Sequence, residues 1–223
     1  MKSIIPIAGT DYFKKDFCKG LIKTEKGPLL KSVLQSRPWI KEISELIFVC
    51  IESKISRDFF KNYLKKWFPN CKVVYLSSPT AGAALSMLAG LSIASDRENE
   101  PIIIDLADIY FETDFIPYKN LENNGYAFTF RSNSDQYSYF ELDNDFKVIK
   151  AVEKKPISQY ASAGVYTFPS CSELLKALAF ALNNAKQITY NDLFYVCPIM
   201  NYLIEENIDI KLIEVKNCID FKF

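Results

Sequence analysis

The sequence predicts an α/β fold, in which a mixed, mostly parallel sheet carries helices on both faces and an added antiparallel hairpin. Three observations predict this fold. Apolar runs alternate with helical segments from residue 4 to residue 106, which is typical of a parallel sheet with crossover helices. The run at 46–51 is continuously apolar and β-branched, as in a strand buried on both faces. After residue 114, strand-like segments follow one another without helices between them.

The first half divides into strand and helix in alternation. The apolar run 4–8 ends at Gly9 and predicts a buried strand. A lysine-rich loop follows, and Pro28 suits the first turn of a helix over 28–35. Further elements of this half are strands at 46–51, 72–76 and 101–106, and helices at 56–67 and 80–94. With right-handed crossovers, these elements give a Rossmann-like arrangement.

The second half is richer in strands. Segments 125–130, 137–142 and 148–153 predict strands, and Asp143-Asn144-Asp145 is a turn sequence that joins the last two as a hairpin. A strand at 163–168, helices at 173–182 and 192–203, and a last strand at 208–215 complete the chain. The sequence contains no linker or repeat, so we expect a single domain over 1–223.

Charge and composition exclude several function classes. The chain has 27 basic and 27 acidic side chains and no histidine. A net charge of zero argues against a nucleic-acid or membrane-surface binder, because both need a broad basic face. Without histidine there is no Ser-His-Asp triad, no Cys-His dyad and no histidine-ligated zinc. A metal site must therefore use oxygen or thiolate ligands.

Cysteine usage and the apolar runs favour a cytoplasmic protein. The six cysteines form no C-x-x-C pair, and we expect them to be reduced core residues rather than disulfides. The short apolar run after Met1-Lys2-Ser3 is unlike a signal peptide. No apolar stretch reaches the roughly 18 residues of a membrane span.

Four segments carry candidate functional residues. Three of them follow predicted parallel strands, whose carboxyl ends form the edge at which such sheets bind ligands, and the fourth follows a strand of the predicted hairpin. Residues 1–31 hold seven lysines against three acidic residues, so the loop 8–20 could cradle a polyphosphate; a solvated lysine face is equally compatible. Asp105 and Asp108 follow an apolar strand and suit Mg²⁺, or cap the next turn. The segment 77–83 offers small residues to a flat ligand, or is an ordinary helix start. The segment 152–166 reads as a loop by composition alone.

Together these segments resemble the sugar-nucleotidyltransferase superfamily, the nucleoside-diphosphate-sugar pyrophosphorylases. The matching stretches occur in the family's order: IIPIAG, KGLI with KGPLL, SPTAGAAL, IIIDLADIYF, and VIKAVEKKPIS with ASAGVYTF. The resemblance covers about residues 3 to 220. It implies a nucleotide-binding half at 1–114 and an acceptor-binding half at 115–223.

The resemblance also implies a reaction and roles. A phosphorylated sugar or small alcohol attacks the α-phosphorus of a nucleoside triphosphate and pyrophosphate leaves, as in the synthesis of precursors for capsule or lipopolysaccharide. Lys19 and Asp108 fall at the catalytic positions, and Asp108 with Asp220 at the Mg²⁺ positions. The nucleotide-binding positions are Ala8, Gly9, Thr10, Lys19, Pro79, Thr80 and Gly82. The acceptor-binding positions are Glu153, Lys154 and Gly164.

The chain departs from the family pattern in its first loop. Where the family has G-x-G-[ST]-R, this loop reads Gly9-Thr10-Asp11-Tyr12-Phe13, and Gly20 replaces the proline after the lysine. Two other hypotheses therefore stay open: a glycosyltransferase that uses Asp105-x-x-Asp108 for its metal, and a non-catalytic nucleotide-binding descendant. The base, the acceptor and the oligomeric state are not predicted.

Overall fold

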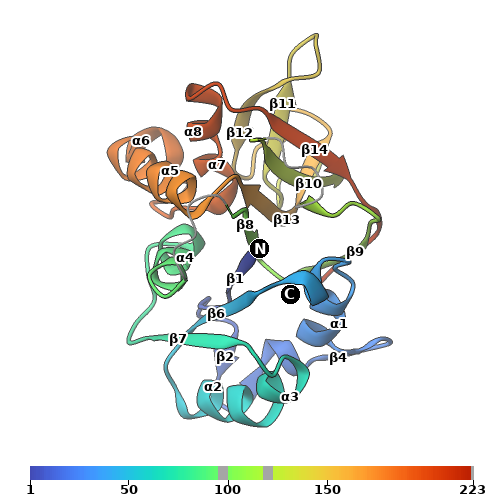
Figure 1. Ribbon diagram of the computed structural model, residues 1–223, viewed down its shortest axis with the longest axis vertical. Coiled ribbons are helices and arrows are strands. Elements are labelled where there is room, and N and C mark those ends of the chain that lie inside the picture. The colour runs from blue at the N-terminus through green and yellow to red at the C-terminus, as the bar shows by residue number, and fades with distance from the viewer. Residues whose placement is uncertain (95–99, 118–122, 222–223) are drawn as a thin grey trace.

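The computed structural model describes residues 1–94, 100–117 and 123–221. Its central sheet has the strand order β12-β11-β13-β8-β1-β6-β7. The first half of the chain contributes four of these strands, and β1 pairs in parallel with β6 and β8, as β6 does with β7. Their bounds are Lys2–Pro6 for β1, Glu45–Ile51 for β6, Lys72–Leu76 for β7 and Ile102–Asp105 for β8. The predicted parallel half is confirmed (Figure 1).

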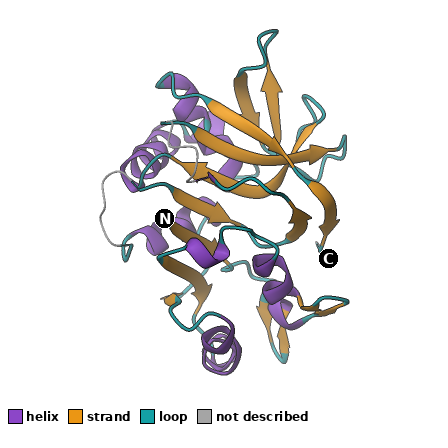
Figure 2. Ribbon diagram, turned by 45° about the vertical axis from the view of Figure 1, so that its right-hand side comes forward, coloured by secondary structure: helices purple, strands orange, loops and turns teal. Residues whose placement is uncertain are grey.

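The second half extends the sheet with antiparallel strands. β13 (Tyr160–Phe168) pairs with β8, and the β11–β12 hairpin (Tyr139–Leu142 and Val148–Val152) pairs with β13. β10 (Gly125–Arg131) also joins β13 and is flanked in parallel by β14 (Ile210–Glu214). The predicted hairpin is therefore present, and it continues the sheet instead of standing apart from it. Figure 2 shows these strands fanning out at the top of the molecule.

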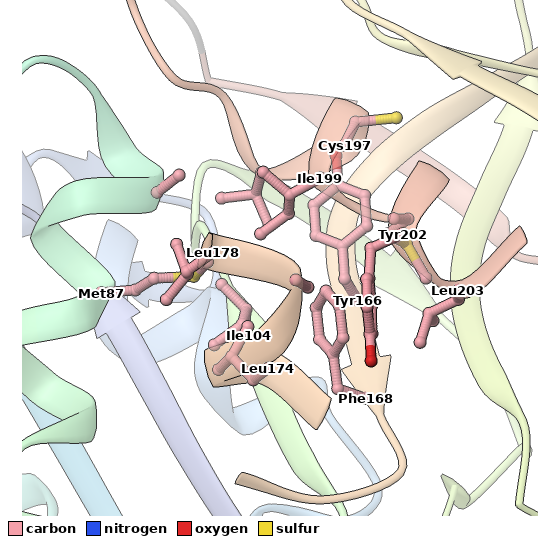
Figure 3. Close-up of a cluster of buried hydrophobic side chains, with 14 of the residues drawn as sticks. Met87, Ile104, Tyr166, Phe168, Leu174, Leu178, Cys197, Ile199, Tyr202 and Leu203 are labelled. Atoms are coloured by element: carbon pink, nitrogen blue, oxygen red, sulfur yellow. The ribbon is translucent and has the colours of Figure 1, made fainter. Parts of the chain in front are cut away.

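Helices cover both faces because neighbouring side chains on each parallel strand point to opposite sides. Ile4 and Ile47 belong to the cluster that packs with α4, α5 and α7, whereas Ile5 and Phe48 belong to the cluster under α1 and α2. Figure 3 shows Met87 of α4, Leu174 and Leu178 of α5, and Ile104 of β8 in the first cluster. The helices are α1 (Leu29–Gln35), α2 (Lys54–Phe59), α3 (Lys65–Trp67), α4 (Ala83–Leu91), α5 (Cys171–Asn183), α6 (Ala185–Ile188), α7 (Val196–Ile199) and α8 (Asn201–Glu205).

Several short elements were not predicted. The π-helical turn η3 (Phe60–Leu64) joins α2 to α3 as one helical segment, and the 3₁₀ turns are η1 (Lys19–Leu21) and η2 (Ile40–Glu42). Two tiny hairpins interrupt the lysine-rich loop: β2–β3 (Phe13–Lys14 and Phe17–Cys18) and β4–β5 (Lys23–Thr24 and Gly27–Pro28). β9 (Ile109–Glu112) pairs antiparallel with β15 (Lys216–Asp220). This pair places the last described strand beside a strand from the middle of the sequence.

The helix predicted over 192–203 is wrong in its first part. Tyr190 and Leu193 face each other in a small antiparallel bridge, and Asn191 and Asp192 between them have φ angles of 49° and 59°. Left-handed residues cannot start a right-handed helix, so helical structure begins only at Val196. The helix expected at 80–94 likewise begins at Ala83, because Gly82 before it has a φ of 113°.

Two compositional expectations concern cysteines and membrane spans. All six cysteines are free thiols, and burial raises the pKa of Cys18 to about 11 and that of Cys50 to about 12. In the described ranges, no helix combines the length and the hydropathy that a membrane crossing needs.

Candidate functional site

A pocket of about 420 Å³ is lined by residues that follow β8 and β12 and by residues of β13. Four residues singled out in the sequence line it together: Asp108, Glu153, Lys154 and Gly164. They come from separate segments of the chain, and the antiparallel β8–β13 pairing brings them together. The structure therefore places the predicted acceptor residues around one cavity with the predicted catalytic aspartate.

The two aspartates after β8 have different environments. Asp105 is buried, and its Oδ2 accepts a 2.8 Å hydrogen bond from Nε of Arg37. Nη2 of Arg37 donates both to Asp105 Oδ1 at 3.3 Å and to the carbonyl of Ile109 at 2.9 Å. The guanidinium also stacks on the ring of Phe111, 3.7 Å from its centroid. Asp105 is thus neutralised by a buried ion pair, and Asp108 is the aspartate of the pair that lines the pocket.

The chain turns sharply between these aspartates. The amide of Ala107 donates to Asp105 Oδ1 at 2.8 Å, and Ala107 has a φ of 54°. Arg37 therefore holds the corner on both sides, through Asp105 before it and Ile109 after it. These contacts of Arg37 were not predicted from the sequence. The signal available was an arginine just after the first predicted helix, in a region whose other basic residues are lysines.

Asp220 lies on the strand that runs beside Asp108, although it does not itself line the pocket. It faces Ile109 across the β9–β15 pair, and the amide of Phe221 donates to the carbonyl of Asp108 at 3.0 Å. The hydroxyl of Tyr137 donates to Asp220 Oδ2 at 2.7 Å. Burial and the neighbouring Asp220 carboxylate raise the pKa of Tyr137, so the phenol stays protonated and remains a donor.

The donor chemistry of Asp108 and Asp220 fits a magnesium ion. Mg²⁺ takes oxygen ligands and is commonly held by one or two carboxylates, with substrate phosphates and water completing an octahedron. Across residues 1–94, 100–117 and 123–221, no group of three or more His, Cys, Asp or Glu side chains is arranged to hold a metal. Asp108 and Asp220 therefore offer two carboxylates on neighbouring segments, a donor type that suits Mg²⁺.

Gly164 approaches the same carboxylate. Its φ is 76°, and a Cβ placed there would lie 3.2 Å from Asp108 Oδ1 and 3.4 Å from Leu106 Cβ. Any side chain at this position would be strained and would crowd the aspartate. Glycine at this position therefore leaves space for the Asp108 carboxylate, in addition to the space for an acceptor that the resemblance implies.

Glu153 and Lys154 form the opposite wall. Ser138 Oγ donates to Glu153 Oε2. Lys154 has a φ of 50°, and its Nζ lies 5.6 Å from the ring centroid of Tyr190 and 5.3 Å from that of Tyr195. These partners were not predicted from the sequence, nor were Asp135 and Gln136, which also line the pocket. The polar run 132–136 in the printed sequence was the signal available for the last two.

The turn at 77–82 borders the pocket without lining it. Pro79, Thr80 and Gly82 lie at this turn, and the next residue, Ala83, lines the cavity. Thr80 Oγ1 donates to the carbonyl of Gly82 at 2.9 Å. Gly82 is required by its neighbour, because a Cβ there would come within 2.3 Å of the carbonyl oxygen of Phe194.

The first loop also lies outside the pocket lining. Gly9 and Thr10 are exposed, Ala8 is buried and Lys19 is half-buried. The amide of Lys19 donates to the carbonyl of Tyr12 at 2.9 Å, which closes the β2–β3 hairpin. The structure thus brings Lys19 back to the loop after β1, but it does not bring it into the cavity with Asp108.

Tyr12 explains the departures in this loop. Its ring is buried, and a Cβ on Gly20 would lie 2.7 Å from the Tyr12 hydroxyl and 2.9 Å from Phe59. Burial is the main cause that raises the pKa of Tyr12, and Cys18, Cys50 and Asp108 add to it. The buried Tyr12 therefore requires a glycine at position 20, since a proline there would collide with the side chains of Tyr12 and Phe59.

Comparisons with known proteins give matches at the level of structure. No protein-family model matches the chain, and no curated protein matches it. A nucleoside-diphosphate-sugar pyrophosphorylase from Vibrio cholerae RC9 superposes with a TM-score of 0.84 at 19% identity, over 99% of this chain and 95% of that one. A putative glucose-1-phosphate thymidylyltransferase from Bacillus anthracis, in complex with a sucrose, gives 0.74 at 16% identity, over 98% and 89%.

A third match is the inositol-1-phosphate CTP transferase from T. maritima, with a TM-score of 0.69 at 13% identity, over 98% of this chain and 86% of that one. The chain therefore has the Rossmann-like fold of nucleoside-diphosphate-sugar pyrophosphorylases and related nucleotidyltransferases. The fold predicted from the sequence resemblance is confirmed.

Proposed function

We propose that this chain, which has the fold of the nucleoside-diphosphate-sugar pyrophosphorylases, is a nucleotidyltransferase. It joins a nucleoside triphosphate to a phosphorylated sugar or small alcohol and releases pyrophosphate. The observation that carries the proposal is the pocket of about 420 Å³, in which Asp108 meets Glu153, Lys154 and Gly164, three residues from a later part of the sequence. The fold alone supports no activity at this level of identity, whereas the joint placement of these four residues does.

The chemistry needs little covalent help from the protein. An oxygen of the acceptor phosphate attacks the α-phosphorus, and the bond from that phosphorus to the oxygen bridging to the β-phosphorus breaks. Because the nucleophile is already an anion, no general base is required, which agrees with the absence of histidine. The work of the site is to align two anionic substrates and neutralise their charge.

Each residue has a role in that alignment. Lys154 holds the acceptor phosphate, and Glu153, kept in place by Ser138, accepts hydrogen bonds from the acceptor's hydroxyl or amino groups. Lys19 neutralises the α-phosphate region. The backbone at Ala8, Gly9 and Thr10 holds the triphosphate, and the turn with Pro79, Thr80 and Gly82 borders the base.

Magnesium completes the proposal. Asp108 and Asp220 would hold the ion, and Tyr137 orients Asp220 through its 2.7 Å hydrogen bond. When bound, the ion supplies positive charge against the phosphates and favours the departure of pyrophosphate. We further propose that the product is a precursor for surface polysaccharide such as capsule or lipopolysaccharide, made in the cytoplasm where nucleoside triphosphates are present.

The two other hypotheses fare differently. A glycosyltransferase that uses Asp105-x-x-Asp108 for its metal is disfavoured, because Asp105 is bound by Arg37 in a buried ion pair. A non-catalytic nucleotide-binding protein is favoured by one observation, the buried Tyr12 in the loop where the family carries an arginine. Turnover distinguishes it from the enzyme.

The test is a pyrophosphate-release assay with CTP, UTP, dTTP, GTP and ATP. Each is paired with phosphorylated sugars, polyols and amino alcohols, with and without Mg²⁺. We expect turnover with one combination that depends on Mg²⁺. Replacing Asp108 by Asn removes a metal ligand, and we expect the rate to fall at least about a hundredfold, as several kcal/mol of transition-state stabilisation are lost.

The matched control is Asp58→Asn, which removes the same charge from an exposed position on α2. It should leave the rate unchanged. Full activity in Asp108→Asn would contradict the assignment of this site. Binding of a triphosphate without turnover of any acceptor would favour the non-catalytic alternative.

A further inference from the structure

A small hairpin lies against the turn before α4 and contributes Tyr195 to the pocket lining. Its two strands meet at Tyr190 and Leu193, whose backbone amides and carbonyls exchange two hydrogen bonds of 3.1 Å. Asn191 and Asp192 form its two-residue tip, both with positive φ. Such tips match the twist of the flanking strands and make short, well-defined hairpins. We call residues 190–195 the clasp.

One side of the clasp holds the turn before α4. The amide of Phe194 donates to the carbonyl of Ala81 at 2.8 Å, and the amide of Ala84 donates to the carbonyl of Phe194 at 3.0 Å. Gly82 lies against the same backbone, with no space for a Cβ. The backbone of the clasp therefore fixes the turn on the nucleotide side.

The other side of the clasp holds the acceptor lysine. The rings of Tyr190 and Tyr195 meet edge to face, with centroids 6.3 Å apart and planes at 72°. Lys154 Nζ lies within 6 Å of both centroids, the range in which an ammonium is attracted to an aromatic face. Lys154 is half-buried, whereas its neighbour Lys155 is exposed. A flexible side chain is thus held at the pocket by two rings.

We propose that Tyr190 and Tyr195 are positioning residues for acceptor binding. They hold the Lys154 ammonium where it receives the acceptor phosphate, while the Phe194 backbone between them fixes the nucleotide-side turn. One hairpin thereby sets the separation of the two substrates, which in-line attack requires. This inference rests on the proposed function for the role of Lys154, but the contact itself is independent of it.

The first experiment measures the lysine directly. The protein is treated with a limiting amount of an acetylating reagent, and the acetylation of Lys154 is followed by peptide mass spectrometry with Lys155 as internal reference. We expect Lys154 to react at least about threefold faster in the Tyr190→Ala/Tyr195→Ala double variant, because loss of two cation–π contacts frees the amine. Lys155 should not change.

The same experiment is repeated with inorganic phosphate as the probe. Phosphate should slow the acetylation of Lys154 in the wild type and have less effect in the double variant. Equal Lys154 rates in the two proteins, or equal protection by phosphate, would overturn the inference. Neither result requires turnover, so this experiment decides the inference even if no substrate pair is found.

The kinetic experiment uses the active substrate pair. We expect the double variant to raise the acceptor KM about tenfold, and the KM of the triphosphate to change less than twofold. Tyr190→Phe/Tyr195→Phe retains both rings and should restore the acceptor KM. Leu182→Ala, which trims an exposed side chain of α5 outside the clasp, should behave like the wild type.

The outcomes separate the two proposals. A wild type that turns over no substrate pair contradicts the proposed function and leaves the acetylation result to decide the role of the rings. An active wild type whose acceptor KM is unchanged in the alanine double variant contradicts the inference and leaves the proposed function standing. Phenylalanine variants as impaired as the alanine variants would also contradict it, because they keep the aromatic faces.

Discussion

Ala107 and Lys154 both hold backbone angles that are unfavourable for residues with a Cβ. Their φ angles are 54° and 50°, and such conformations cost about 1–3 kcal/mol unless the surroundings impose them. At Ala107 the imposing contact is the 2.8 Å hydrogen bond from its amide to Asp105. Both residues lie at or beside the candidate site, whereas other residues with positive φ, such as Phe146 between β11 and β12, lie in turns elsewhere.

Arg37 is the residue whose loss should affect this corner most. Replacing it by Met keeps much of the volume, but leaves Asp105 buried without its cation and the carbonyl of Ile109 without its donor. Breaking a buried ion pair in this way costs about 3–5 kcal/mol. We expect the urea midpoint to fall accordingly, and the Mg²⁺ dependence of pyrophosphate release to weaken, because Asp108 follows the corner.

The double variant Arg37→Met/Asp105→Asn tests how much of the lost stability comes from the unpaired buried charge of Asp105. It removes the unpaired carboxylate and keeps an oxygen for the Ala107 amide, so it should recover part of the lost stability. If the double variant is as unstable as the sum of the two single variants, Arg37 and Asp105 do not act as a pair.

At the scale of elements, the backbone conformation at the tip of the clasp predicts how substitutions of Asp192 change the melting temperature. Asp192 has a φ of 59°, a conformation that costs an ordinary L-residue about 1–2 kcal/mol and a β-branched one more. We expect Asp192→Val to lower the melting temperature by at least about 2–4 °C for a chain of this size. Asp192→Gly should leave it unchanged or raise it, because glycine is favoured at such tips. A valine variant as stable as the glycine variant would contradict the geometry assigned to the tip.

The elements also show why sequence reasoning succeeded in some places. β6 was predictable because its residues form a continuous apolar run. β7 was predictable because its short apolar run lies between charged and polar segments. Asp192 misled because its neighbours have helical spacing, while its left-handed backbone is imposed by the clasp around it. β9 and β15 were missed because each pairs only with a strand more than a hundred residues away.

The candidate site was predictable to a similar extent. Motif order proposed Asp108, Glu153, Lys154, Gly164 and Asp220, and the first four of these line one pocket. Their partners were not: Arg37, Tyr137, Tyr190 and Tyr195 contribute through contacts that no local pattern encodes. The pairing of Asp105 with Arg37 illustrates the limit, since two aspartates three residues apart look equivalent in sequence, whereas Asp105 is buried in an ion pair and Asp108 is half-buried and lines the pocket.

At the scale of the whole molecule, buried thiols make stability depend on alkaline pH. Burial raises the pKa of Cys18 from its ordinary value of 9.0 to about 11, and that of Cys50 to about 12. Below pH 9 these thiols are protonated in the folded and the unfolded chain, and their contribution is complete. Above pH 9 only the unfolded chain loses the protons, so we expect the free energy of unfolding to fall between pH 9 and about 12.

Urea unfolding at intervals from pH 8 to 11 measures this dependence. The matched variant is Cys50→Val, which keeps an apolar side chain on β6 and removes a titrating group. Its stability should decline less steeply above pH 9 than that of the wild type. Identical slopes would show that Cys50 does not contribute to the alkaline loss.

The β9–β15 pair has a consequence for the protein during its own synthesis. A nascent chain that has emerged through β13 already contains Asp108, Glu153, Lys154 and Gly164. It lacks β15, the strand that pairs with β9 and carries Asp220. If Asp108 and Asp220 hold the ion as we propose, the ribosome releases the two proposed ligands at separate times, and ion binding must wait for β15.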